Sequence, residues 1–116
     1  RRSWGFYKVL HEMGPEIKVK ELDVTPGKTL SMQKHELRNE LWFVAEGEAK
    51  VYTISPVNSD LELWGTFKTH DKLSIDRQKW HMLANETKKP LKIIEIQYGE
   101  SCVEEDIERK SNVTPR

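Results

Sequence analysis

The residues best suited to chemistry lie in the stretch GKTLSMQKHELRNELWFVAEG, which begins at position 27. Gln33 and His35 are separated by one residue, and Glu40 follows His35 five positions later. Residues i and i+2 of a β-strand point to the same face, so Gln33 and His35 can reach one point together. Glu40 returns to that point only if the chain turns near Arg38–Asn39.

A second histidine, His81, follows after a long strand-rich stretch and precedes Asn85. Two imidazoles, one carboxylate and one amide oxygen form a mixed nitrogen and oxygen donor set that suits a divalent transition metal. Taken singly, each residue also fits an ordinary reading, as a partly buried histidine or a surface carboxylate. Taken together, they indicate a small metal-binding β-barrel.

Composition excludes several other classes of protein. The 116 residues make one domain with room for a core. Lys plus Arg and Asp plus Glu both number 19, so the basic excess of a nucleic-acid binder is absent. No apolar run is long enough to cross a membrane. Cys102 is the only cysteine and has no partner for an internal disulfide, so we expect a reducing compartment, the cytoplasm.

Short strands separated by turns predict an all-β sandwich or barrel. The run Leu41–Ala45 is continuously apolar, so we expect it to be buried on both faces, with a hairpin turn at Glu46–Glu48. Ser101 is positioned to cap a short helix over Val103–Arg109. We expect a single domain over residues 1–110 and a frayed tail over 111–116. The predicted strands are Ile17–Val24, Thr29–His35, Leu41–Ala45, Ala49–Ser55, Leu61–Phe67, Lys72–Ile75, Trp80–Ala84 and Leu91–Tyr98.

The strand predicted over Ile17–Val24 has an unusual alternation. Leu22 and Val24 share a face with Lys18 and Lys20, so one end of that face is apolar and the other is charged. This pattern fits a strand that crosses a barrel wall from the core to the mouth. If Leu22 and Val24 face inward, both lysines point into the mouth.

The spacing of these residues resembles the first motif of the cupins: Gly, five residues, Gln-x-His, four residues, Glu, six residues, Gly. Gln33 stands where most cupins have a first histidine. The second cupin motif ends in a histidine and an asparagine, and His81 to Asn85 fits that ending.

Several further blocks resemble the mannose-6-phosphate isomerase domain that forms the C-terminal part of bifunctional isomerase/guanylyltransferase enzymes. The block Asp76–His81 departs from that family, since it has lost the Pro and Gly of PxGxxH, and Glu36, Leu37 and Leu41 stand where the family often has histidine. The matching blocks are Arg2–Tyr7, Ile17–Lys20, Pro26–Gly27, Leu30–His35, Leu37–Val51, Pro90–Glu100 and Glu104–Arg109.

The resemblance implies a cupin fold, that is, a double-stranded β-helix or jelly-roll barrel. It also implies a metal-dependent enzyme that isomerises mannose 6-phosphate to fructose 6-phosphate. Zinc is the expected metal, with Mn, Fe, Co or Ni as alternatives. The implied metal ligands are Gln33, His35, Glu40 and His81.

Interconversion of an aldose and a ketose phosphate also needs cations that grip the phosphate and polarise oxygen atoms. We place Lys20 and Arg109 among the catalytic residues and Lys18 and Arg38 among the substrate-binding ones. Solvated surface charge is the alternative for each. The general base is not identified.

Two other functions remain open. A non-catalytic or regulatory cupin that binds a sugar or small anion is favoured by the lost Pro and Gly. An iron oxygenase is disfavoured, since such cupins more often supply three histidines. The expected partner is a small sugar phosphate, with no nucleic acid and no membrane, and exposed sheet edges predict a homodimer.

Overall fold

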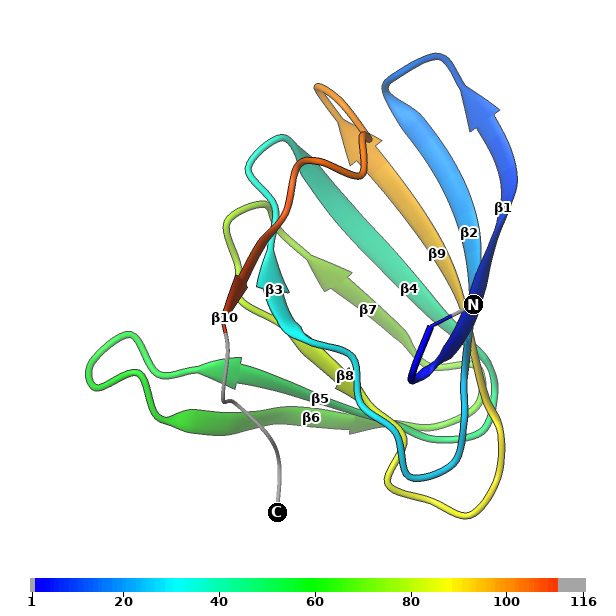
Figure 1. Cartoon of the computed structure of the whole chain (residues 1–116), viewed down its shortest axis with the longest axis vertical. Coiled ribbons are helices and arrows are strands. Elements are labelled where there is room, and N and C mark those ends of the chain that lie inside the picture. Colours follow the sequence, from blue (N-terminus) through cyan, green and yellow to red (C-terminus); the bar gives the residue numbers. More distant parts are fainter. Residues whose placement is uncertain (1, 111–116) are drawn as a thin grey trace.

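The computed structural model describes residues 2–110, and these residues form ten β-strands (Figure 1). The tail predicted over 111–116 lies outside the described residues. The strands are β1 (Gly5–Met13), β2 (Ile17–Val24), β3 (Met32–Lys34), β4 (Arg38–Glu46), β5 (Ala49–Ile54), β6 (Leu61–Phe67), β7 (Lys72–Ile75), β8 (Met82–Ala84), β9 (Leu91–Gly99) and β10 (Glu108–Lys110).

The strands form two facing walls (Figure 1). One wall is a five-stranded sheet in the order β1-β2-β9-β4-β7. The other contains the three-stranded sheet β6-β5-β8 and the two-stranded sheet β10-β3. Isolated bridges from Thr29 to Ala84 and from Gln33 to His81 join these two smaller sheets. The prediction of an all-β barrel is confirmed.

The inner face of the large sheet is divided into an apolar half and a polar half. On β2, β9 and β4, two buried apolar residues point inward at one end, and two buried polar residues point inward at the other. Strand register aligns these ends, because Lys20 pairs with Glu95 and Glu40 pairs with Gln97. We call the polar half the group Lys18, Lys20, Arg38, Glu40, Glu95 and Gln97.

The hydrophobic core lies against the apolar half. Its buried members come from both walls and pack with the partly buried Trp4, Tyr7, Leu30, Trp64, Phe67 and Leu73. The core therefore fills one end of the barrel with apolar side chains, and the buried polar side chains lie at the other end. The buried core residues are Leu22, Val24, Trp42, Val44, Ala49, Val51, Ile75, Leu83, Leu91 and Ile93.

The helix predicted over Val103–Arg109 is wrong. In the described residues this segment contains turns and then β10, which pairs with β3. The Asp106 carboxylate accepts hydrogen bonds from the backbone N–H groups of Glu36 and Leu37, each at 2.9 Å. These long-range bonds outweigh the local helix signal. Residues 2–110 contain no helix that could span a membrane.

The hairpin predicted at Glu46–Glu48 and the two-sided burial predicted for Leu41–Ala45 are also wrong. Gly47 adopts a positive φ of 90° at a turn, but β4 pairs with β9 and β7, whereas β5 pairs with β6 and β8. The turn is therefore a corner between the walls. The run Leu41–Ala45 is buried on one face only, because Phe43 on the outer face is 36% exposed and stacks on His70.

Candidate metal centre

Three side chains predicted as metal ligands converge in the polar half. His35 follows β3, Glu40 lies on β4, and His81 immediately precedes β8. The turn predicted near Arg38–Asn39 is wrong by two residues, because the chain bends at positions 36–37 and β4 already begins at Arg38. Each side chain is buried, and one ligand atom from each lies within 4.8 Å of the other two. The Gln33–His81 bridge brings the two sequence motifs together.

Backbone carbonyls fix the orientation of both imidazoles. His35 Nδ1 lies 2.7 Å from the carbonyl oxygen of Asp106, and His81 Nδ1 lies 2.8 Å from that of Lys79. A carbonyl oxygen only accepts hydrogen bonds, so each Nδ1 carries the proton and each Nε2 presents a lone pair. Orientation of a metal-binding histidine by such a partner is common in metalloproteins.

These lone pairs face the Glu40 carboxylate. His35 Nε2 lies 3.2 Å from Glu40 Oε2, and His81 Nε2 lies 3.7 Å from Oε1. Such acceptors repel one another unless positive charge lies among them. The Arg38 guanidinium lies 3.3 Å from His35 Nε2 and 3.0 Å from Glu40 Oε2, and a divalent ion would bring positive charge to His81 Nε2 as well. The donor set therefore fits a divalent ion, with His35, Glu40 and His81 as the residues that would hold it.

Burial keeps both imidazoles in the neutral form that metals bind. Burial, assisted by the Arg38 charge, lowers the pKa of His35 to about 4. Burial is also the main cause that lowers the pKa of His81 to about 4. Both rings are therefore neutral at pH 7 and need no deprotonation before binding a cation.

Gln33, the fourth predicted ligand, lies beside the three buried residues. Its main chain pairs with that of His81, and its side chain is among those that line the cavity next to the centre. The Gln33 amide nitrogen donates to the backbone oxygen and the hydroxyl of Ser31, each at 3.3 Å. Coordination by the Gln33 oxygen stays a prediction. Asn85 is buried and structural, since its amide donates to the carbonyls of Val24 and Lys89.

Two neighbouring side chains hold Glu40 in place. Arg38 Nε donates to Glu40 Oε2 at 3.0 Å, and the Trp42 indole donates to Glu40 Oε1 at 3.0 Å. Arg38 also contacts His35 Nε2 at 3.3 Å and donates to the Val103 carbonyl at 3.2 Å. Arg38 lines the cavity, but its guanidinium is committed to holding the centre and the C-terminal segment together.

Glu95 is a buried carboxyl group that sequence reasoning missed. Its Oε2 accepts from the Trp42 indole at 3.0 Å, and its Oε1 accepts from Gln97 at 3.1 Å. Burial and the nearby Glu40 raise the pKa of Glu95 to about 8. The signal was present in the sequence, because Glu95 and Gln97 share a face with Leu91 and Ile93, the same alternation seen on β2.

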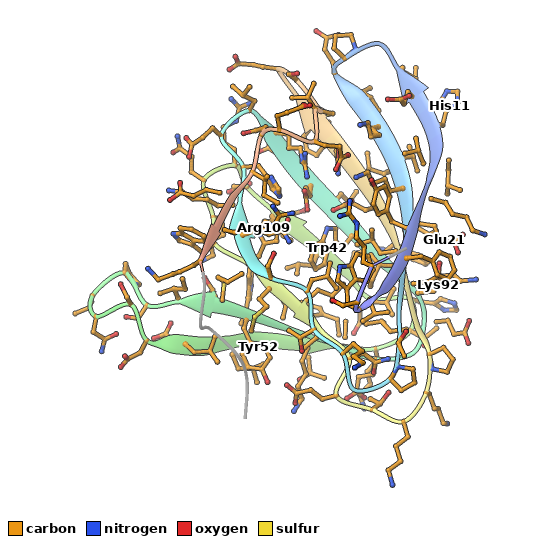
Figure 2. All side chains as sticks on the ribbon, in the orientation of Figure 1. His11, Glu21, Trp42, Tyr52, Lys92 and Arg109 are labelled. Carbon is orange, nitrogen blue, oxygen red and sulfur yellow. The ribbon has the colours of Figure 1, made fainter. Side chains whose placement is uncertain are left out.

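A cavity of about 510 Å³ opens beside the centre. Figure 2 shows Trp42 on the concave side of the large sheet and Arg109 on the opposite wall, and both line the cavity. Lys20 lines it as well. Lys18 is not among the lining residues, but it shares the partner Glu104 with Lys20. The inward direction predicted for both lysines is confirmed by their burial.

The turn before His81 forms without the family's Pro and Gly. Gln78 stands at the glycine position and adopts a φ of 69°. Its N–H donates to the His35 carbonyl at 2.7 Å, and the N–H of Arg77 donates to the Asn39 side chain at 2.7 Å. These bonds hold a left-handed conformation that glycine would adopt without strain.

The fold and the site define a cupin. An uncharacterised protein from Klebsiella pneumoniae with a double-stranded β-helix domain superposes with a TM-score of 0.76 at 15% identity, covering 97% of this chain and 89% of that one. A cupin superfamily protein from Desulfitobacterium hafniense superposes with a TM-score of 0.66 at 17% identity, covering 84% and 80%. At such identities the likeness concerns the fold alone.

Sequence comparisons place this chain in one particular family within the cupin fold. The model of the mannose-6-phosphate isomerase C-terminal domain matches residues 1–112, so this chain belongs to that family. Alginate biosynthesis protein AlgA from Pseudomonas aeruginosa is 38% identical over 115 residues, which cover 99% of this chain and 22% of AlgA. Xanthan biosynthesis protein XanB from Xanthomonas campestris is 39% identical over 108 residues, covering 93% and 21%. The chain thus spans about a fifth of these relatives.

Proposed function

We propose that this chain is a metal-dependent sugar-phosphate isomerase that interconverts mannose 6-phosphate and fructose 6-phosphate. The observation that carries the proposal is the buried group of His35, Glu40 and His81 beside a cavity of about 510 Å³ in a chain of this family. A divalent ion held by these residues, zinc in our proposal, would polarise an oxygen of the bound sugar.

The protein's own residues supply the remaining requirements. Lys20 faces the cavity from β2 and Arg109 faces it from β10, so cations approach a bound phosphate from both walls. Lys18 lies outside the lining and pairs with Glu104, which does line the cavity.

Moving a proton between adjacent carbons requires a group that holds it in between. Glu95 is a buried carboxyl group facing the cavity, and Gln97 and Trp42 fix its two oxygens. We assign the proton-carrying role to Glu95 because of this position, next to both Lys20 and the metal centre.

The isomerase proposal is tested by a coupled mannose-6-phosphate isomerase assay on Glu40→Ala and His81→Ala. Both variants should lose bound metal and turnover together. Retained turnover in both would refute a metal-dependent isomerase. A metal-binding cupin without catalytic activity is the second candidate, favoured by the altered turn at Gln78. That candidate predicts bound metal without turnover in the unmodified chain.

A further inference from the structure

The carboxylate of Glu104 lies between two buried ammonium groups. Glu104 Oε2 accepts a hydrogen bond from Lys20 Nζ at 2.6 Å and lies 3.4 Å from Lys18 Nζ. The side chains of Lys20 and Lys18 are only 6% and 11% exposed, whereas that of Glu104 is 49% exposed. The two ammonium groups are thus buried, and the carboxylate that they share reaches them from the surface. Lys18 Nζ also lies 3.7 Å from the carboxylate of the exposed Glu12, whereas Glu104 is the carboxylate paired with Lys20.

Both lysines are held by the sheet rather than by Glu104. They stand two residues apart on the inner face of β2, paired with Glu95 and Gln97 of β9. The Lys20 ammonium also lies 4.3 Å from the centre of the Tyr7 ring. Two fixed, buried positive charges form a site for an oxyanion, because leaving them without a partner is costly.

Glu104 lies on a segment whose backbone is anchored on both sides. The Val103 carbonyl accepts from Arg38 at 3.2 Å, and the Asp106 carboxylate accepts from the backbone of Glu36 and Leu37. The backbone around Glu104 is therefore fixed, and its half-exposed side chain can rotate outward without unfolding anything. Burial alone would raise the pKa of Glu104, but the hydrogen bond from Lys20 holds it below its usual range, so the carboxylate is charged.

Lys20 and Glu104 line the same cavity as Glu40 and His81. An anionic substrate entering that cavity meets the ammonium groups already occupied by a carboxylate. A phosphate offers more acceptor oxygens and more charge than Glu104, so it competes for the same donors.

We propose that Glu104 is a built-in competitor that fills an oxyanion site formed by Lys18 and Lys20 and is displaced when an incoming phosphate binds there. The inference rests on the proposed function only for the identity of the anion, the phosphate of a sugar phosphate. Glu104 then sets substrate affinity: it protects the two buried charges in the empty protein and lowers the affinity for phosphate.

The test is titration of the full chain with inorganic phosphate, followed by calorimetry, for the unmodified protein, Glu104→Gln and Glu105→Gln. Glu105→Gln removes the same charge from an exposed neighbour on the same segment. Loss of the half-exposed Glu104 carboxylate, which pairs with both lysines, should tighten phosphate binding about fivefold in Glu104→Gln. Glu105→Gln should bind phosphate like the unmodified protein. Adding Lys20→Met to Glu104→Gln should abolish the gain.

A second readout guards against a misfolded variant. Glu104→Gln should melt at a lower temperature than the unmodified chain in phosphate-free buffer. Addition of phosphate should remove this difference in melting temperature. Glu104→Asp, which keeps the charge but is one methylene shorter, should show an intermediate gain in phosphate affinity. Equal or weaker phosphate binding by Glu104→Gln, or an equal gain in Glu105→Gln, would overturn the proposal.

The outcome is separable from that of the isomerase proposal. Tighter phosphate binding in Glu104→Gln without turnover in any variant would support the oxyanion site and refute the isomerase. Turnover together with unchanged phosphate affinity in Glu104→Gln would support the isomerase and refute the role of Glu104 as a competitor for the oxyanion site.

Discussion

The main chains of Gln33 and His81 hydrogen-bond to each other in both directions, and each N···O distance is 2.9 Å. This pair joins the segment that carries His35 to the segment that carries His81. The two histidines are therefore brought together by backbone pairing between the two small sheets. The protein, rather than the ion, assembles the donor set.

Removal of metal should consequently leave the fold intact. Treatment with a chelator is expected to leave the far-ultraviolet circular dichroism of the chain unchanged, with a lowered melting temperature from the loss of bound ligand. Re-addition of zinc should restore the melting temperature. Loss of the β-sheet signal on chelation would show instead that the ion holds the two segments together.

Trp42 links the two buried carboxyl groups, since its single indole N–H contacts both Glu40 and Glu95 at 3.0 Å. Trp42→Phe keeps most of the ring but leaves these buried oxygens without their donor. We expect a loss of about 1–3 kcal/mol in the free energy of unfolding, measured in urea. Trp64→Phe, which lies away from both carboxyl groups, is the control. A loss in Trp42→Phe no greater than in Trp64→Phe would show that the indole bonds contribute little.

Gln78 carries the strain of the turn before His81, with a φ of 69°. Gln78→Gly should raise the free energy of unfolding by about 1 kcal/mol, because glycine adopts this conformation without a steric penalty. Its exposed side-chain bond to Glu36 is lost in exchange. Lys79→Gly, at the next position and without a positive φ, should be destabilising. Equal effects of the two glycine substitutions on urea unfolding would contradict the strain argument.

Alternation along single strands predicted the inner face of this protein well. The period of two placed Lys18 and Lys20 on the same face as Leu22, and the structure buries all three. The same reasoning applied to Leu91–Tyr98 would have found Glu95. Side-chain direction within a strand is fixed locally, so sequence reveals it.

The sequence did not reveal which strands pair with each other, although it did reveal the direction of the side chains. The turn at Gly47 was visible, but whether it closes a hairpin or turns a corner depends on which strands compete for β4, and β9 and β7 take both of its edges. The helix predicted after Ser101 failed for a similar reason. Asp106 bonds to Glu36 and Leu37, residues remote in sequence, and this long-range contact leaves no local signature.

Asp23 should make stability depend on pH. Burial, together with the hydrogen bond and charge of Glu21, raises the pKa of Asp23 to about 6, partly opposed by Lys92 and Lys8. The folded chain thus binds a proton that the unfolded chain has released, so stability falls as pH rises toward 6. Glu21, whose pKa is lowered, acts in the opposite direction at more acidic pH.

Asp23→Asn should therefore be more stable than the unmodified chain at pH 7, and its stability should vary less between pH 4.5 and 6. Urea unfolding at a series of pH values measures both effects. Asp76→Asn, a substitution at an exposed position, should leave the pH dependence unchanged. An unchanged pH profile in Asp23→Asn would show that Asp23 is not the group responsible.

The most direct test of the metal-dependent isomerase is metal content by elemental mass spectrometry together with a coupled mannose-6-phosphate isomerase assay on the same purified sample. We expect about one divalent ion per chain, and turnover that chelation abolishes and zinc restores. Absence of bound metal after supplementation with Zn, Mn, Fe, Co and Ni, or turnover that survives chelation, would contradict it.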